Sequence, residues 1–584
     1  MRSFLAVSVA PGSTSALRHP VDAAVRCLAD AAVSVDQVDD GADGWLAFAG
    51  AESRDAFDGG AFTVRLGRAA RTATGDATTE QLIKLVATES GLIDVVPPFA
   101  LAHRAAGGAP VIAAVDWLGL RQLYWWQGDG VAAISTSARA LAELAGAGYD
   151  QAGLAAQAMI GWQIGEATVF SGVSALPPAT IATLDGGTIS LRQYAGSPRL
   201  VGPAPKLDDA VDEMADILRR WIAAYLSDHP DSVLQLTGGH DSRILLAAIA
   251  KGDRAGLRTL TLGDPTSPDV RIAAELSQRY GMRHQVRELD QELWPTPEQA
   301  HRLAIESAHA LETMASPLAL TPLLLAEARL EQGHRLSGLG GEVARGFYYA
   351  GQPSAAQTSP RLVQRLARWR VFANEMVEET ALEPAFYADA QATTLARLQD
   401  IFTPGDWLRA TDDFYLFNRM HRWSGTHSTV ATVRRHFINP MFDRRFIELA
   451  LAVAPADKRD SLLLGRLAQR LDPELAAIPL DSGLAPSRLG TRSPVTRVAT
   501  STLTARKVLR KVSQRLSNGR RPQLGAGQAS ALVLEHWRSN PAACAALYDL
   551  PFLRHQWLDE VLAGQRAAAP TTAAFLVNLV AAKS

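Results

Sequence analysis

Val233-Leu-Gln-Leu-Thr-Gly-Gly-His-Asp-Ser242 is the stretch of this chain that decides its fold. The apolar run at its start is typical of a short buried strand, a glycine-rich turn follows, and residues 242–250 are typical of a helix. This order forms a phosphate cradle, because free N–H groups and the helix dipole attract anions. The stretch lacks the Gly-Lys-Ser/Thr of a Walker A loop, so it predicts a phosphate site of another kind. An ordinary turn before a helix is the alternative.

The composition excludes several classes of protein. The chain has 584 residues, 47% hydrophobic and 20% charged, which is globular composition with room for roughly two to four domains. A net charge of −2 gives no field that would attract nucleic acid or an anionic membrane. The two cysteines, Cys27 and Cys544, form no metal or disulfide spacing, so we expect a cytoplasmic protein. We expect no membrane span, and we interpret residues 1–10 as a first strand rather than a signal peptide.

Two regions with different patterns divide the chain. Short apolar runs at 44–49, 61–66 and 110–115, separated by Gly and Asp, predict an antiparallel β-rich domain. A turn-rich connector at 196–205 then marks the predicted boundary between residues 1–200 and 207–584.

The second region has long amphipathic helices with strands between them. Residues 257–262 are typical of a second buried strand, Ser267-Pro268 of a helix start, and Gly281 of its end. Alternating strands and helices predict a parallel α/β sheet that binds ligands at the carboxyl ends of its strands. The remainder is predicted to be mainly helical, and its basic segment 506–521 is most simply a solvated surface.

Several stretches, in a shared order, resemble the asparagine synthetase family. The central loop is similar to the Ser-Gly-Gly-x-Asp-Ser pyrophosphate loop of the N-type ATP pyrophosphatases, with Thr237 in the first position. Val115–Tyr124 is similar to the family's Asp-x-x-Gly-x-x-x-Leu-Tyr hairpin, and Thr168–Pro178 to the segment that closes its first domain. Leu336–Glu342 is similar to the family's second nucleotide loop, and Phe437–Asp443 to its Arg-x-Pro-Phe-Leu-Asp stretch. The likeness runs from about residue 110 to 490.

The resemblance implies a fold of class α/β plus α+β with two domains. Residues 1–200 would form a degenerate class II glutamine amidotransferase-like domain, an Ntn-hydrolase-like antiparallel β sandwich with helices. Residues 207–584 would form a parallel α/β ATP-pyrophosphatase domain (adenine nucleotide alpha hydrolase-like) of asparagine synthetase type with extra helices. The implied enzyme is an AMP-forming amide synthetase that uses ATP and Mg²⁺. A carboxylate attacks the α-phosphorus, an acyl-adenylate forms, and an amine displaces AMP.

The matched residues would hold the nucleotide, with the pyrophosphate against Thr237, Gly238, Gly239, Asp241 and Ser242. The resemblance places the adenine against Leu236 and Leu262, and it closes the site with backbone groups of Ser337 and Gly338. An acidic group beside phosphates needs a bridging cation, so Asp241 is expected to bind Mg²⁺, and Glu342 of the second loop likewise. The alternatives are sheet core for the two leucines and helix-start charges for the two acids.

Three departures from the family affect the chemistry. Members that hydrolyse glutamine begin Met-Cys, whereas this chain begins Met1-Arg-Ser3, so we expect no glutamine hydrolysis. Leu339 stands where the family has a glutamate that helps to deprotonate the amine. Tyr348 matches the tyrosine after that loop, but needs a partner to act as a base because its ordinary pKa is about 10. Glu312 is a candidate replacement, and its alternative role is a salt-bridged helix carboxylate.

The third departure is a missing lysine that stabilises charge on the adenylate in relatives. The corresponding stretch, Ile478 to Arg488, contains none. Arg488 could supply a fixed positive charge, and Lys458 is a poorer positional match.

These features together predict a ligase that joins a carboxylate and an amine supplied by its own small-molecule or peptide substrate. This is the pattern of β-lactam synthetases and lasso-peptide macrolactam cyclases, and the second is our leading expectation. A protein that processes a precursor peptide would then be a partner, and nucleic acid would not. The alternatives are an ammonia-dependent asparagine synthetase and a nucleotide-binding scaffold that has lost catalysis.

Overall fold

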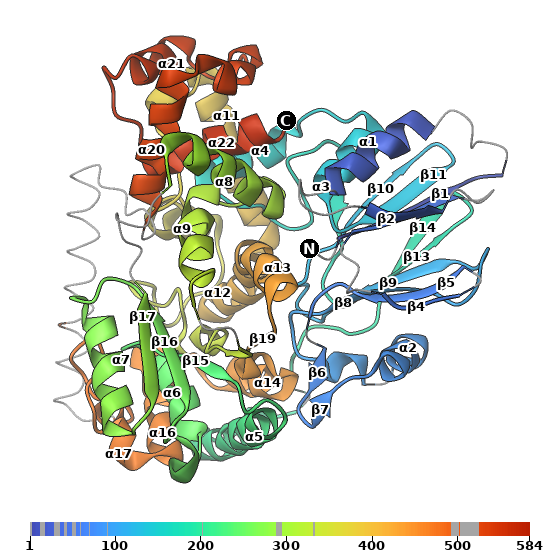
Figure 1. Ribbon diagram of the computed structural model, residues 1–584. Helices are drawn as coiled ribbons and strands as arrows, with labels where there is room; N and C mark the ends of the chain where they lie inside the picture. The colour runs from blue at the N-terminus through green and yellow to red at the C-terminus, as the bar shows by residue number, and fades with distance from the viewer. Residues whose placement is uncertain are drawn as a thin grey trace.

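The computed structural model describes residues 3–11, 18–28, 35–39, 44–49, 54–58, 60–68, 70–89, 91–200, 202–287, 295–330, 333–491, 502 and 525–583. The basic segment 506–521 lies outside these residues. Two large antiparallel sheets come from the first 193 residues, and a parallel sheet comes from residues 233–438 (Figure 1). The predicted combination of an antiparallel β-rich region and a parallel α/β region is therefore confirmed. None of the described helices combines the length and apolar composition needed to cross a membrane.

The two antiparallel sheets pack face to face. The first has the strand order β12 (Ser174–Ala175), β10 (Tyr124–Gly128), β11 (Val131–Ser135), β1 (Ser3–Val9), β3 (Gly44–Ala49), β2 (Val35–Asp39). The second has the order β14 (Thr188–Gln193), β13 (Thr180–Asp185), β9 (Val111–Val115), β8 (Ala100–Arg104), β5 (Ala61–Arg65), β4 (Arg54–Asp58). Phe4 and Phe48 of the first sheet meet Phe62 of the second, with ring centroids 5.2–6.0 Å apart.

Helices cover the outer faces of this sandwich (Figure 1). Helices α1 (Arg18–Leu28) and α3 (Ala138–Ala145) share a buried apolar cluster with the first sheet. Helix α2 (Thr79–Thr88) packs on the second sheet in the same way. A short hairpin, β6 (Arg71–Thr72) and β7 (Gly75–Asp76), lies beside α2.

The parallel sheet has the strand order β17 (Arg283–Arg287), β16 (Arg258–Leu262), β15 (Val233–Gln235), β18 (Arg335–Leu336), β19 (Phe437–Ile438). In chain order this is 3-2-1-4-5, so the direction of winding reverses between β15 and β18. Such a switch point, at the carboxyl ends of the strands, is where open α/β sheets bind ligands. Helix α6 (His240–Ala248) follows β15 and packs against α5 (Leu207–Asp228) and α16 (Leu462–Leu471).

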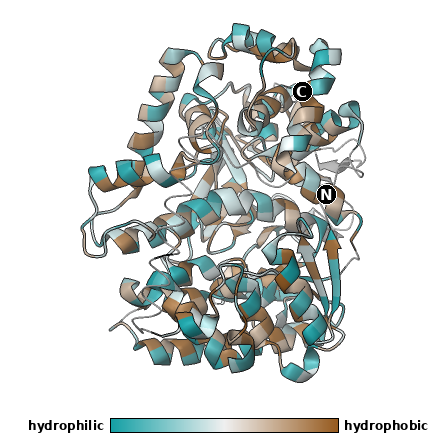
Figure 2. Cartoon of the chain, turned by 90° about the vertical axis from the view of Figure 1, so that its left-hand side faces the viewer, coloured by the Kyte–Doolittle hydropathy of each residue, from teal (hydrophilic) through white to brown (hydrophobic). Residues whose placement is uncertain are grey.

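Helix α7 (Pro268–Arg279) confirms the helix start predicted at Ser267-Pro268. The Ser267 side chain accepts a hydrogen bond from the Val270 N–H, and Pro268 occupies the first turn. The other α-helices of the described residues are α4 (Gln151–Ile160), α8 (Pro297–Ala310), α9 (Pro317–Glu327), α10 (Pro360–Leu366), α11 (Pro384–Ile401), α12 (Trp407–Phe414), α13 (Gly425–Arg434), α14 (Arg444–Ala452), α15 (Pro455–Lys458), α17 (Pro473–Ala476), α18 (Pro486–Leu489), α20 (Ala526–Ser539), α21 (His555–Leu562) and α22 (Pro570–Ala581). Hydrophilic and hydrophobic residues alternate along many of these helices, as the predicted amphipathic pattern requires (Figure 2).

The loop after β9 is built around Asp116, the acid of the matched hairpin. Its buried carboxylate accepts backbone hydrogen bonds of 2.9–3.0 Å from four N–H groups, those of Phe99, Leu118, Leu120 and Arg121. Because all four donors are fixed by one side chain, the loop presents a defined surface to the rest of the chain.

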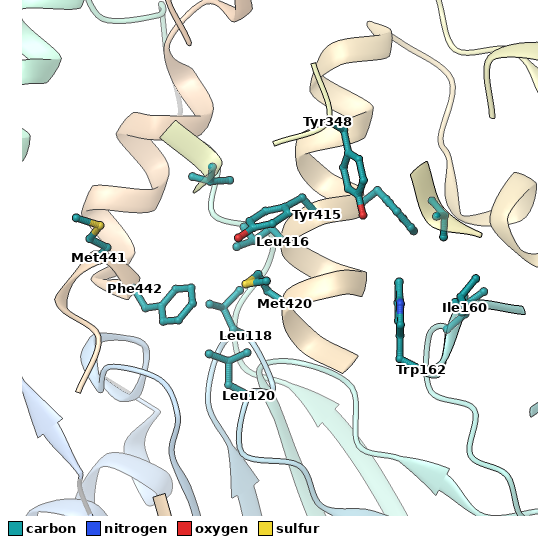
Figure 3. Packing of buried hydrophobic residues seen from close by; sticks show 14 of the residues in the cluster. Leu118, Leu120, Ile160, Trp162, Tyr348, Tyr415, Leu416, Met420, Met441 and Phe442 are labelled. Carbon is teal, nitrogen blue, oxygen red and sulfur yellow. The ribbon is translucent and has the colours of Figure 1, made fainter. Parts of the chain in front are cut away.

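That surface docks on the π-helix η9 (Tyr415–Ser424) of the C-terminal region. Gln122 donates a 2.8 Å hydrogen bond from Nε2 to the His421 carbonyl oxygen. Leu118 and Leu120 lie close to Met420 (Figure 3). The two regions of the chain therefore share one apolar core at this contact.

His421, buried in this contact, should make the folded state sensitive to acid. Burial, and then the charge of Arg422, lowers the pKa of His421 to about 3. Between that value and the ordinary pKa of about 6.5, the unfolded chain binds one more proton than the folded chain. We expect this histidine to remove about 1.4 kcal/mol of stability for each pH unit of acidification in that window.

The test compares urea unfolding of the protein with that of His421→Asn across this pH window. In the variant, the free energy of unfolding should depend less steeply on pH, by about 1.4 kcal/mol per pH unit, which corresponds to one proton. Replacement of the exposed His19 by asparagine is the control and should leave the slope unchanged. Equal slopes in the protein and in His421→Asn would contradict the assignment.

Candidate functional site

The first loop, residues 237–242, leads from β15 into α6 and includes the first three residues of that helix. Three N–H groups of this loop donate hydrogen bonds to side-chain oxygen atoms. The Thr237 N–H donates to Ser242 Oγ at 3.0 Å, and the Gly239 N–H donates to Thr237 Oγ1 at 3.2 Å. The Gly238 N–H donates to Asp269 Oδ1 at 2.9 Å. The loop is thus a set of donors directed at oxygen, which is what a phosphate cradle requires.

The second loop, residues 337–341, follows β18 and touches the first directly. A Cβ on Gly338 would lie 2.7 Å from the Asp241 carbonyl carbon and 2.8 Å from the Ser242 nitrogen. The Ser337 side chain accepts a 3.3 Å hydrogen bond from the Leu339 N–H, which fixes the turn. The two loops that resemble nucleotide loops therefore meet at the switch point of the sheet.

This close approach gives Gly338 a predicted stability effect. Gly338→Ala places a methyl group against backbone atoms of the first loop, so the loops must separate. We expect the free energy of unfolding to fall by about 1–3 kcal/mol, the usual range for overpacking. Gly252→Ala is the matched control, because a Cβ there meets open space. If urea unfolding shows equal stabilities for the two variants, the loop contact is looser than described.

Asp241 and Glu342 form an acidic pair between the loops. The Arg345 guanidinium bridges them, with Nη2 3.4 Å from Asp241 Oδ2 and 3.5 Å from Glu342 Oε1. Burial raises the pKa of Asp241, and the Glu342 charge adds to this, while Arg345 opposes it. In the described part of the chain, the buried Asp241 Oδ1 accepts no hydrogen bond. A buried carboxylate oxygen without a hydrogen-bond donor, in a carboxylate that is close enough to Glu342 to be affected by its charge, fits Mg²⁺, which prefers oxygen ligands.

Asp481 is a site residue that the sequence reasoning missed. Its N–H donates to the Gly238 carbonyl oxygen at 3.1 Å, and its charge, after burial, raises the pKa of Asp269. Arg243 of α6 holds the segment in place, donating from Nη1 to the carbonyl oxygens of Ile478 (2.6 Å) and Pro479 (3.1 Å). The sequence does offer a signal for Asp481, because this residue lies in the stretch from Ile478 to Arg488 that lacks the expected lysine.

Arg488 itself lies on α18 with an exposed side chain. Its helix packs on α16, which in turn contacts α6. The expected role of Arg488 at the adenylate stays a prediction.

The two predicted adenine contacts have different surroundings. Leu236 is 0% exposed within the core, so its side chain is not available to a nucleotide, and the sheet-core alternative holds for it. Strand alternation explains this, because successive side chains point to opposite faces. Leu262 and Gln235 instead line a cavity of about 580 Å³. The residues that line this cavity include three leucines and three arginines, namely Leu320, Leu323, Leu324, Arg68, Arg434 and Arg435.

Tyr348 lies in an aromatic cluster and is 3% exposed. Its ring centroid is 4.9 Å from that of Phe347. The ring centroid of Tyr415, also labelled in Figure 3, is 6.5 Å from it. The carboxylate partner that a basic tyrosine needs belongs instead to its neighbour Tyr349, whose hydroxyl donates to Asp412 Oδ2 at 2.6 Å. Burial, and then the Asp412 charge, raises the pKa of Tyr349, so this phenol stays protonated near neutral pH.

Lys458 is fully buried and forms an ion pair with Asp412. The short helix that follows it, η11 (Arg459–Ser461), contacts η6 (Gly341–Arg345) behind the second loop. The positive charge of Lys458 is therefore present near the site, but the carboxylate of Asp412 already compensates it.

The expectation that Glu312 acts as a base beside the loops is not supported by its position. Its Oε2 accepts hydrogen bonds from Ser137 Oγ at 2.9 Å and from the Arg139 N–H at 3.2 Å, at the start of α3. Glu312 thus fastens the C-terminal region to the sandwich, where its charge is matched to a helix N-terminus. It also lines a small cavity of about 60 Å³ with Ser3 and Cys27, and burial raises the pKa of the Cys27 thiol.

Comparisons with known proteins do not assign a family. No protein-family model matches the chain, and no curated protein matches it. One similar solved structure is described as the allosteric regulatory enzyme of purine biosynthesis, with 9% identity, a TM-score of 0.21, and coverage of 49% of this chain and 80% of the other. Another is glutamine phosphoribosylpyrophosphate (PRPP) amidotransferase from B. subtilis complexed with ADP and GMP, with 9% identity, a TM-score of 0.20, and coverage of 57% and 81%. At these TM-scores, neither neighbour supports an argument about the fold or chemistry of this chain.

Proposed function

We propose that this chain is an ATP-dependent, AMP-forming amide-bond synthetase of the asparagine synthetase type. The observation that carries the proposal is the meeting of two glycine-containing loops, 237–242 and 337–341, at the switch point of a parallel sheet. In this proposal the C-terminal region is an ATP-pyrophosphatase domain. The N-terminal sandwich is a degenerate Ntn-type amidotransferase domain.

The loops would bind the nucleotide through their own groups. The N–H groups of Thr237, Gly238 and Gly239 would turn from side-chain oxygens to pyrophosphate oxygens, and the N-terminus of α6 would add its dipole. Asp241 and Glu342 would hold Mg²⁺, which when bound would neutralise charge on the phosphates. Arg345 already lies between these carboxylates, so its positive charge is close to the leaving pyrophosphate.

The reaction has two displacements. A carboxylate oxygen attacks the α-phosphorus, the bond between the α-phosphorus and the bridging oxygen breaks, and pyrophosphate leaves. An amine nitrogen then attacks the acyl carbon, AMP leaves, and a base takes the amine proton. The cavity beside Leu262 would take the acyl substrate, with leucines against its apolar part and arginines against its carboxylate.

The amine is proposed to come from the substrate rather than from glutamine. Cysteine chemistry needs a thiolate, yet burial raises the pKa of the Cys27 thiol, and burial raises that of Cys544 to about 11. A cytoplasmic peptide macrolactam cyclase of the lasso type, working with a precursor-peptide-processing partner, is the form of this proposal that we favour. An ammonia-dependent asparagine synthetase is the variant in which free ammonia replaces the internal amine.

A nucleotide-binding scaffold is the second candidate function. It is favoured by Leu339, which cannot accept a proton, and by the compensation of Lys458 through Asp412. Such a protein would bind ATP without cleaving it.

ATP–pyrophosphate exchange separates these functions. The full chain is assayed with Mg²⁺ across aspartate and a panel of amino-acid and peptide carboxylates. Exchange that depends on a carboxylate supports the ligase and identifies its acyl donor, and dependence on aspartate alone favours asparagine formation. Binding of ATP without exchange in the presence of every acid, including peptides that carry both reacting groups, would favour the scaffold.

A further inference from the structure

Four polar residues from separate segments lie together at the amino ends of the parallel strands, on the opposite side of the sheet from the two loops. His229 ends helix α5, Asp231 lies in the turn before β15, and His334 and His436 precede β18 and β19. The sheet ladder brings them together, since the Val233 N–H donates to the His334 carbonyl oxygen at 2.7 Å, and the Arg335 N–H donates to that of His436 at 2.8 Å.

Their side chains face one another at short distances. The ring centroids of His229 and His334 are 4.0 Å apart in a stacked arrangement, and those of His334 and His436 are 4.5 Å apart. His334 Nδ1 lies 2.8 Å from Asp231 Oδ1. One donor atom from each of His229, Asp231 and His334 falls within 4.8 Å of the others. The cluster is reachable, because the two imidazoles are 12% and 23% exposed and the carboxylate 49%.

Ordinary packing does not account for this convergence of donors. A second pair of stacked histidines, His301 and His536, has centroids 4.8 Å apart, and His301 Nδ1 accepts from Trp537 Nε1 at 3.2 Å. That pair has the ring contact of a packed core. The cluster at His229 and His334 differs from that pair, because carboxylates also lie at hydrogen-bonding distance from its closely spaced imidazoles.

We propose that His229, Asp231 and His334 form a binding site for a divalent transition-metal ion of the zinc class. Two imidazole nitrogens and one carboxylate oxygen suit Zn²⁺, whereas Mg²⁺ and Ca²⁺ prefer oxygen ligands throughout. Donor atoms around tetrahedral zinc lie about 3.3 Å apart, given bonds of about 2.0–2.1 Å. Side-chain shifts of about 1 Å bring the present donors to that spacing. His436 or a solvent molecule completes the shell.

The ion would join the two regions of the chain. Asp76, on β7 of the N-terminal region, lies with Oδ2 2.8 Å from His229 Nε2. A carboxylate in that position orients a metal-bound histidine through its second nitrogen. The site is separate from the Asp241–Glu342 pair, because it lies at the amino ends of the strands. It therefore does not depend on the proposed ligase function.

Cobalt is the probe that reports both binding and geometry. The full chain is stripped of metal with a chelator and titrated with Co²⁺, with absorption recorded in the visible range. We expect one equivalent of Co²⁺ to give the intense bands of four-coordinate cobalt, and Zn²⁺ to displace it and raise the melting temperature. Absence of both the bands and the shift in melting temperature would overturn the proposal.

Variants tie the signal to the named ligands. His334→Gln and Asp231→Asn should each lose the bands, and Asp76→Asn should keep them while weakening Co²⁺ binding by about 10–100-fold. His301→Gln is a control that should bind Co²⁺ like the unchanged chain. Circular dichroism of the metal-free variants checks that they fold. Bands that persist in both ligand variants would also overturn the proposal.

Discussion

Replacement of Asp241 by alanine is expected to reduce carboxylate-dependent ATP–pyrophosphate exchange by about 10²–10³-fold, the usual cost of losing one preorganised charge-stabilising group. The reason is the position of this carboxylate between the two loops, where one of its oxygens accepts no hydrogen bond from the described residues and the Glu342 charge is nearby. Without it, Arg345 keeps a single acidic partner in the site, and the cation that should bridge the phosphates loses one ligand. The measurement is the initial exchange rate at saturating ATP and acyl donor.

The control for this prediction is Asp253→Ala. Asp253 is an exposed aspartate on the short helix η4 (Lys251–Asp253), outside both loops. Its removal should leave the exchange rate unchanged, and the melting temperatures of both variants show whether they remain folded. An Asp241→Ala enzyme that exchanges as fast as the control would remove this residue from the proposed metal site.

The second large effect concerns stability. Lys458→Met is expected to lower the free energy of unfolding by about 3–5 kcal/mol, since breaking a buried ion pair leaves an uncompensated charge. Lys458 is 0% exposed and Asp412 is 3% exposed, so the remaining carboxylate would have no access to water. The Tyr349 hydroxyl would still donate to it, and the charge of Arg409 would still act on it. Urea unfolding at neutral pH measures the change.

Two further variants sharpen this test. Addition of Asp412→Asn to Lys458→Met removes the stranded charge and should recover much of the lost stability, as a double-mutant cycle would show. Lys251 pairs with Glu474 at the surface, where the two side chains are 58% and 65% exposed, so Lys251→Met should change stability little. A Lys458→Met variant no less stable than Lys251→Met would show that the buried pair contributes nothing net.

Local sequence patterns predicted the elements of this fold well. The apolar run 44–49 is strand β3, the runs at 61–66 and 110–115 each differ from their strands by one residue, and the run at 257–262 contains β16. Helix α6 begins at His240, two residues before the predicted start. In each case the signal lies within about ten residues, where hydrophobic periodicity and capping residues act.

The parts of the site that sequence reasoning missed depend on distant segments. Arg345 has no pattern that marks it as the bridge between Asp241 and Glu342, and only folding brings it there. Lys458 ranks below Arg488 in the sequence because it is a poorer positional match, and its partner Asp412, 46 residues away, carries no recognisable motif. The partners of Glu312, Ser137 and Arg139, belong to the other region of the chain, so local sequence could not indicate them.

The hydrogen bonds from Arg243 to residues 478 and 479 also determine when the first loop can reach its final shape. Their partners lie 235 and 236 residues further along the chain. A ribosome adds about 5–20 residues per second, so roughly 10–50 s pass between synthesis of the loop and synthesis of the segment that holds it. During that interval β15 and α6 lack these contacts. The growing chain must therefore keep this apolar strand from other partners until synthesis has passed β19, the last strand of the parallel sheet.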